Sequence, residues 1–97
     1  MTRQENFIRL LNEASPYIQK EFGVKELCLF GSVARNEDTC DSDVDIFVDM
    51  PPKAFKLIEL RDFLQELLGS AVDVVRSHSH LDPFLKKEIE RDGIAII

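Results

Sequence analysis

Positively charged residues are scarce in this sequence. Its 97 residues include 12 Lys and Arg against 18 Asp and Glu, which gives a formal net charge of −6. Proteins that bind DNA or RNA without sequence preference contact phosphates through Lys and Arg, so they carry the opposite balance. The charge therefore argues against long nucleic acid as a partner, whereas a small nucleotide accompanied by metal ions remains compatible.

Cysteine and long apolar runs are also rare. Cys28 and Cys40 have neither the spacing of a zinc site nor the density of a disulfide-linked scaffold. No apolar stretch approaches the roughly 20 residues that cross a bilayer. The N-terminal residues are polar and amphipathic, unlike a signal peptide. We therefore expect a cytoplasmic protein that makes no use of a membrane.

The chain has no repeat, linker or low-complexity segment, so we expect a single domain over residues 1–97. Apolar residues recur at helical spacing in some segments and alternate with a period of two in others. Helices are predicted around 7–11, from Ser15-Pro16 to Gly23, and at 31–35, 54–68 and 84–91. Strands are predicted over 25–30, 43–49, 71–75 and 94–97, and a solvated loop over 36–41. The fold class is therefore α/β.

Three aspartates lie in predicted strands. Asp43 and Asp45 are two residues apart, so both carboxylates share one face of their strand. Two carboxylates this close repel each other unless a cation lies between them, although such a pair is also common on a solvated strand face. Asp73 lies in an apolar run, where burying an unpaired charge would be costly. A structural ion pair would explain Asp73, and a metal shared by all three would explain the set; oxygen ligands suit Mg²⁺ or Mn²⁺ rather than zinc.

A Gly-Ser pair, Gly31-Ser32, follows the predicted strand over 25–30. Glycine lets the backbone approach a phosphate closely, and N–H groups at the start of a helix attract anions. The Ser32 hydroxyl adds a donor. Alone, such a pair is usually only a turn, but together with the downstream aspartates it predicts a site for polyphosphate and divalent metal.

These residues resemble a known family signature. The segments LFGSVAR at 29–35 and SDVDI at 42–46 are similar to the GSxAR and SDxD motifs of minimal nucleotidyltransferases, the MNT domains of the polymerase beta superfamily. The resemblance covers nearly the whole chain. It implies a polymerase-beta-type core, with a small mixed sheet of three to four strands flanked by helices.

The resemblance implies a role for each motif residue. Two Mg²⁺ ions, or Mn²⁺, would be bound by Asp43, Asp45 and Asp73, with Asp73 also able to take a proton. The nucleoside triphosphate would be held by Gly31, Ser32, Arg35 and Ser42. For Arg35 a structural ion pair is the alternative. Family members often have Gly after this Arg, whereas this chain has Asn36. Because Asn tolerates left-handed backbone, we expect the turn to be kept.

The resemblance also implies a reaction and a partner. AMP would pass from ATP, or a nucleotide from another nucleoside triphosphate, to a hydroxyl group. In HEPN/MNT toxin–antitoxin pairs this hydroxyl is a tyrosine of the HEPN ribonuclease, and an acidic chain would suit a basic partner. Two alternatives stay open: an antitoxin that neutralises its partner by contact alone, and a transferase for a small molecule. A homodimer is a further option.

Several aromatic and histidine residues have a structural alternative to a functional role. Phe55, Phe63 and Phe84 are predicted to lie in the core rather than to stack on a base. His78 and His80 are predicted to be exposed loop residues, with a place at the mouth of the site or on a metal as the alternative.

Overall fold

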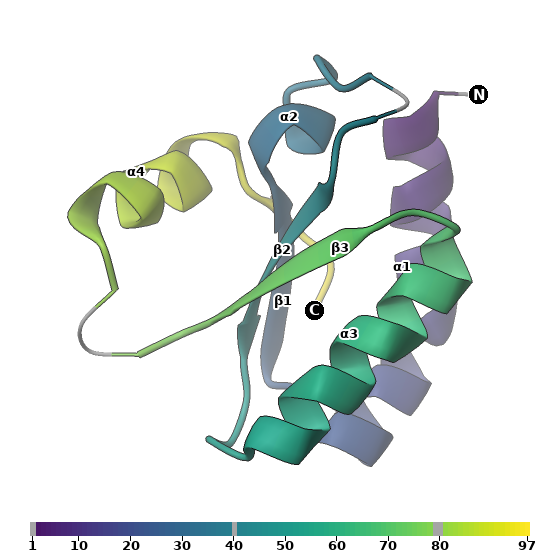
Figure 1. Cartoon of the computed structure of the whole chain (residues 1–97), viewed down its shortest axis with the longest axis vertical. Coiled ribbons are helices and arrows are strands. Elements are labelled where there is room, and N and C mark those ends of the chain that lie inside the picture. Colours follow the sequence, from purple (N-terminus) through teal and green to yellow (C-terminus); the bar gives the residue numbers. More distant parts are fainter. Residues whose placement is uncertain (1, 40, 79–80) are drawn as a thin grey trace.

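The fold is a four-stranded mixed sheet flanked by helices, as the family resemblance predicted (Figure 1). The computed structural model describes residues 2–39, 41–78 and 81–97, which leaves Cys40 and His80 outside the described residues. The strands are β1 (Glu26–Phe30), β2 (Val44–Asp49), β3 (Val72–Arg76) and β4 (Ile94–Ala95). The helices are α1 (Arg3–Phe22), α2 (Gly31–Ala34), α3 (Ala54–Leu68) and α4 (Pro83–Asp92).

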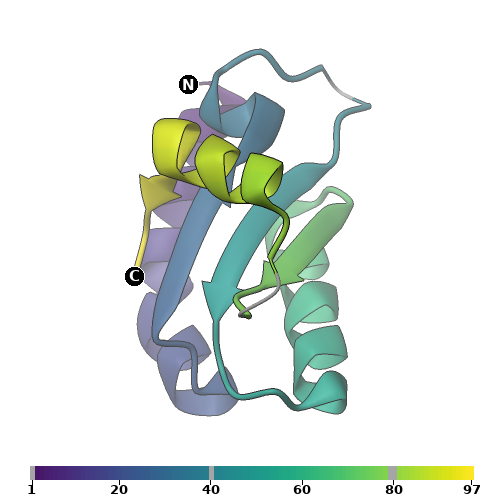
Figure 2. The same ribbon diagram turned by 90° about the vertical axis from the view of Figure 1, so that its left-hand side faces the viewer.

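The sheet has the strand order β3-β2-β1-β4. Antiparallel pairs join β1 to β2 and to β4, whereas β2 and β3 run parallel. Helices α1 and α3 cover one face of the sheet, and α4 lies over the other face, as the two ribbon views together show (Figure 2). The sheet is therefore the middle of three layers.

The period of two in β2 decides which side chains enter the core. Val44, Ile46 and Val48 are fully buried and pack with the buried residues of α1 and α3. The alternate positions, Asp45 and Phe47 among them, point to the face that carries α4. The predicted strand with one face in the core is confirmed, and its other face, which carries Asp45, is available for a functional site.

The predicted start of a second helix at Ser15-Pro16 is wrong, because α1 runs through Pro16 without a break. Pro16 has no N–H to donate to the carbonyl of Asn12 one turn earlier. The Ser15 hydroxyl donates to that carbonyl instead, at 2.9 Å. The N-cap of this helix is Thr2, whose side chain accepts a hydrogen bond from the N–H of Glu5.

The loop over 36–41 is less solvated than predicted. The Asp38 side chain is only 5% exposed, and its Oδ2 lies 2.6 Å from Arg3 Nη1. Arg3 also donates to Ser70 Oγ at 3.1 Å. The loop is therefore tied to the first turn of α1, while Glu37 keeps an exposed side chain.

Two of the three phenylalanines predicted for the core lie on the surface instead. Phe55 is 83% exposed and Phe84 is 86% exposed. Phe55 lies in the first turn of α3, away from the buried leucines of that helix. Phe84 lies in the first turn of α4, a helix in which no residue is fully buried. Phe63 does pack inward, with its ring 5.0 Å from that of Tyr17.

Candidate active site

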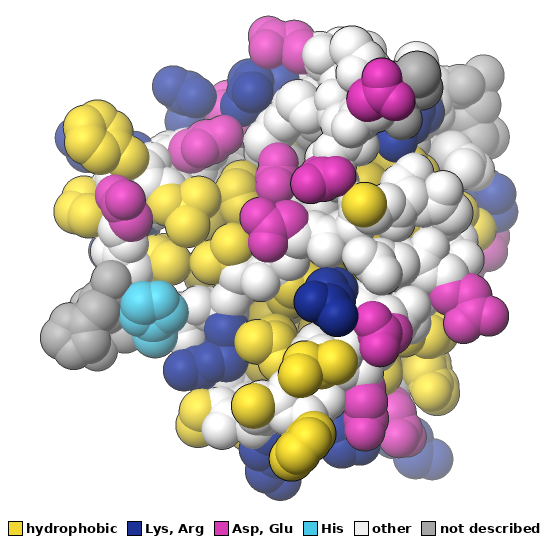
Figure 3. Space-filling view, in the orientation of Figure 1, with side chains coloured by type: hydrophobic (Ala, Val, Ile, Leu, Met, Phe, Trp, Pro, Cys, Tyr) yellow, Lys and Arg dark blue, Asp and Glu magenta, His cyan; other side chains and the backbone are white. Residues whose placement is uncertain are grey.

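The three predicted aspartates come together at one end of the sheet. In the parallel pairing of β2 and β3, Asp45 is the register partner of Asp73, so their side chains leave the same face about 4.8 Å apart. Asp43 immediately precedes β2. The space-filling view shows acidic side chains gathered near the middle of this face (Figure 3).

Asp73 is not buried, contrary to the expectation from its apolar neighbours. It is exposed, as is Asp43, whereas Asp45 is half-buried. The reason is topological: β3 is the edge strand of the sheet, and α4 packs against α2 and β1 instead of covering it. An approaching molecule can therefore reach Asp73 from solvent.

Burial and the neighbouring carboxylates distinguish Asp45 from the other two aspartates of the cluster. Burial first, and then the charges of Asp73, Glu88 and Asp43, raise the pKa of Asp45 to about 6, against a weaker opposing effect of Arg35. The cluster therefore has an excess of negative charge that a cation would offset.

Gly31 fits so tightly against Asp45 that no side chain can replace its hydrogen. Its φ is +75°, a left-handed conformation that favours glycine. An added Cβ would overlap Asp45 Oδ2 and lie 2.9 Å from Asp45 Cγ. The backbone at the start of α2 thus runs directly beside the carboxylates.

The two serines occupy different environments. The Ser32 hydroxyl has no hydrogen-bond partner among the described residues, and the residue is half-buried beside Gly31. Ser42 Oγ accepts a hydrogen bond from Thr39 N at 2.9 Å, so this side chain closes a turn ahead of Asp43.

Asn36 adopts φ 58°, which confirms that Asn keeps the left-handed turn where the family often has Gly.

Arg35 connects the start of this site to α4. Its Nη1 lies 3.1 Å from Glu88 Oε1 and 3.4 Å from Asp92 Oδ2, and its Nε lies 3.1 Å from Glu37 Oε2. Glu88 was not among the residues predicted for the site from the sequence. The signal that could have found it is the i, i+4 spacing of Glu88 and Asp92, which presents two carboxylates on one side of a helix to a cation.

The donor atoms in the cluster are oxygens, which hard divalent cations prefer as ligands. Carboxylate oxygens of Asp43, Asp45 and Asp73 suit Mg²⁺ or Mn²⁺. Within residues 2–39, 41–78 and 81–97, no three acidic, histidine or cysteine side chains already surround one metal position. The carboxylates are thus close enough to repel one another, but they do not form a complete metal-coordination site by themselves.

Comparison with known proteins identifies the family. A family model described as a nucleotidyltransferase domain matches residues 11–96, a range that contains all the motif residues. The chain belongs to the nucleotidyltransferase family. This nucleotidyltransferase is 41% identical to protein adenylyltransferase MntA of Thermococcus cleftensis, over 99% of this chain and 98% of that relative.

Solved structures agree with the assignment. The nucleotidyltransferase superposes with a TM-score of 0.75 on a structure named as a minimal nucleotidyltransferase, at 32% identity, with 97% of this chain and 95% of that chain covered. It also matches a mutant of the toxin–antitoxin pair MntA-HpeT, with a TM-score of 0.64 and 26% identity over 94% of this chain and 68% of that chain. No helix in the described part of the nucleotidyltransferase is long and apolar enough to span a membrane.

Proposed function

We propose that this chain transfers AMP from ATP to a tyrosine hydroxyl of a HEPN-family ribonuclease toxin, with the help of two Mg²⁺ ions. The observation that carries the proposal is the register of β2 and β3, in which Asp45 lies beside Asp73 and against the Gly31 backbone. The relative named protein adenylyltransferase and the toxin–antitoxin neighbour support the choice of reaction and partner.

Asp43, Asp45 and Asp73 would hold the metal ions. All three offer carboxylate oxygens, and a cation would offset the repulsion that, after burial, raises the pKa of Asp45. Bound Mg²⁺ would offset the charge of the triphosphate and lower the pKa of the attacking hydroxyl.

The start of α2 would hold the triphosphate. Gly31 brings the backbone close to the carboxylates, and the Ser32 hydroxyl would donate to a phosphate oxygen. Ser42 would support this end of the site through its turn. Arg35 would have to release Glu88 or Asp92 before it could contact a phosphate, so the loss of these ion pairs would oppose phosphate binding by Arg35.

The acceptor would approach from the exposed side of Asp73. Its oxygen would attack the α-phosphorus, the bond from that phosphorus to the bridging oxygen would break, and pyrophosphate would leave. Asp73 would take the hydroxyl proton. Catalysis would rest mainly on positioning and on stabilisation of developing charge.

The test uses purified protein, Mg²⁺, ATP radiolabelled at the α-phosphate and the product of the neighbouring gene. We expect label on the partner protein, none from ATP labelled at the γ-phosphate, and none when the acceptor tyrosine is replaced by phenylalanine. The double variant Asp43→Ala, Asp45→Ala should lose transfer, whereas Asp49→Asn, at the far end of the same strand face, should keep it.

Two results would favour another function. If the double variant still neutralised the partner as well as the native chain does, contact alone would suffice. If label accumulated in a small molecule rather than in protein, the acceptor would be of another class.

A further inference from the structure

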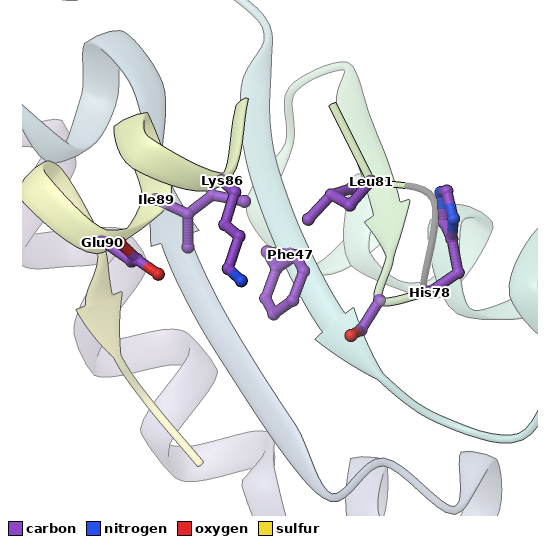
Figure 4. A pocket seen from close by; sticks show the side chains of 7 residues that line it. Phe47, His78, Leu81, Lys86, Ile89 and Glu90 are labelled. Atoms are coloured by element: carbon purple, nitrogen blue, oxygen red, sulfur yellow. The ribbon is translucent and has the colours of Figure 1, made fainter. Parts of the chain in front are cut away.

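A pocket of about 340 Å³ lies between α4 and the sheet, on the strand face to which Asp45 also points (Figure 4). Phe47 of β2 forms its floor, and Lys86, Ile89 and Glu90 of α4 form one wall. Leu81, in the segment that follows β3, lies on the opposite side. This volume is at the lower end of the range for small-molecule sites.

The pocket continues the row of side chains that begins at the carboxylates. Phe47 is two residues beyond Asp45 on β2 and points to the same face, about 7 Å along the strand at ~3.3 Å per residue. A ribose bridges a distance of this order. A nucleotide with its α-phosphate at Asp45 can therefore extend its base over Phe47.

The other directions from Asp45 are already assigned in the proposed function. The triphosphate tail would lie toward Gly31 and the start of α2. An in-line displacement requires the acceptor on the side opposite the leaving pyrophosphate, which is the exposed side of Asp73. The pocket beyond Phe47 is the direction that remains for the base.

The lining has the chemistry that a purine requires. Lys86, Ile89 and Glu90 are spaced i, i+3 and i+4, so they share one face of α4. Phe47 offers a flat aromatic ring and Ile89 an aliphatic side chain on which a base could pack, and the Lys86 ammonium points toward the Phe47 ring. Lys86 can donate to a ring nitrogen, and the Glu90 carboxylate can accept from an exocyclic amino group.

We propose that this pocket binds the purine base of the donor nucleotide. The inference rests on the proposed function, because it needs a nucleoside triphosphate at the carboxylates. Arg35 links the two parts, since its ion pairs with Glu88 and Asp92 hold the pocket wall against the end of α2. Base and triphosphate would thus be positioned by one connected set of elements.

The test measures the affinity of three probes by calorimetry in Mg²⁺: ATP, CTP and tripolyphosphate. Lys86→Met should weaken ATP binding about tenfold, the effect of losing one hydrogen bond to a charged group. CTP should lose less, because the smaller cytosine ring carries its ring nitrogen and amino group less far from the ribose and so less far into the pocket; tripolyphosphate should be unchanged. Lys87→Met is the matched control, because Lys87 carries the same charge on the same helix but does not line the pocket. Phe47→Leu, which keeps most of the volume, should also reduce the preference for ATP over CTP.

The outcomes separate the inference from the proposed function. If Lys86→Met and Phe47→Leu melt like the native chain and bind ATP as tightly, with an unchanged preference over CTP, the pocket does not hold the base, although transfer chemistry can stand. A higher KM for the acceptor with unchanged ATP affinity would give the pocket to the acceptor and overturn the inference. If the native chain bound neither ATP nor tripolyphosphate, the proposed function would fail as well.

Discussion

Replacing Asp45 by Asn should make the metal-free protein more stable at neutral and alkaline pH. Burial and the neighbouring carboxylates raise the pKa of Asp45 from 3.8 to about 6. At 1.36 kcal/mol per pKa unit this rise corresponds to about 3 kcal/mol. Because Asp45 is only half-buried, solvent screening reduces the expected effect to about 1–1.5 kcal/mol.

The sign follows from which state binds the proton more tightly. The folded protein binds the Asp45 proton more tightly than the unfolded chain does. The protonated Asp45 therefore contributes its full stability below about pH 4, and this contribution is lost as the pH rises through about 6. Asp45→Asn removes that loss. At pH 8 the variant should therefore exceed the native chain by about 1–1.5 kcal/mol, or about 5–10 °C in Tm, while losing nucleotidyl transfer.

The assay is thermal unfolding between pH 4 and pH 8, with EDTA and with Mg²⁺. Mg²⁺ should stabilise the native chain at pH 8 and have little effect on Asp45→Asn, because the cation offsets the same charge that the substitution removes. Asp49→Asn is the control and should change neither curve in this way. If Asp45→Asn gave no gain at pH 8, or if its gain were equal at pH 4, the repulsion argument would be refuted.

Three further substitutions test the packing around the site. Gly31→Ala should lower the free energy of unfolding by more than about 2 kcal/mol in urea, since left-handed backbone alone costs about 1–2 kcal/mol and the new methyl overlaps Asp45; an unchanged midpoint would contradict the close approach. Phe55→Ser should change stability by no more than about 0.5 kcal/mol, whereas Leu60→Ala, on the buried side of α3, should cost about 2–5 kcal/mol; equal effects would return Phe55 to the core. Asp38→Asn should cost about 1–3 kcal/mol in chemical unfolding, because Arg3 loses its only carboxylate partner among the described residues and keeps neutral acceptors such as Ser70 Oγ; an unchanged unfolding midpoint would contradict a stabilising role for this ion pair.

Much of the fold was predictable because local pattern decides it. The predicted helix over 54–68 matches α3, and the predicted strands differ from the observed ones by a residue or two at their ends. The errors arose where a neighbour supplied what local pattern could not show. Pro16 stays inside α1 because Ser15 satisfies the freed carbonyl. Asp38 leaves solvent because Arg3 lies beside it.

The sequence by itself determined the elements and the motif residues of this nucleotidyltransferase, because hydrophobic period, glycine positions and motif spacing act over a few residues. Tertiary structure decided which of these residues meet. The parallel pairing of β2 with β3 brings Asp45 to Asp73, and the edge position of β3 leaves Asp73 open to solvent. The packing of α4 on the same face as Asp45 adds Glu88 and Lys86, which lie about 40 residues further along the chain than the aspartates of β2. Such contacts depend on how strands and helices far apart in the chain are packed, and only the folded molecule contains that information.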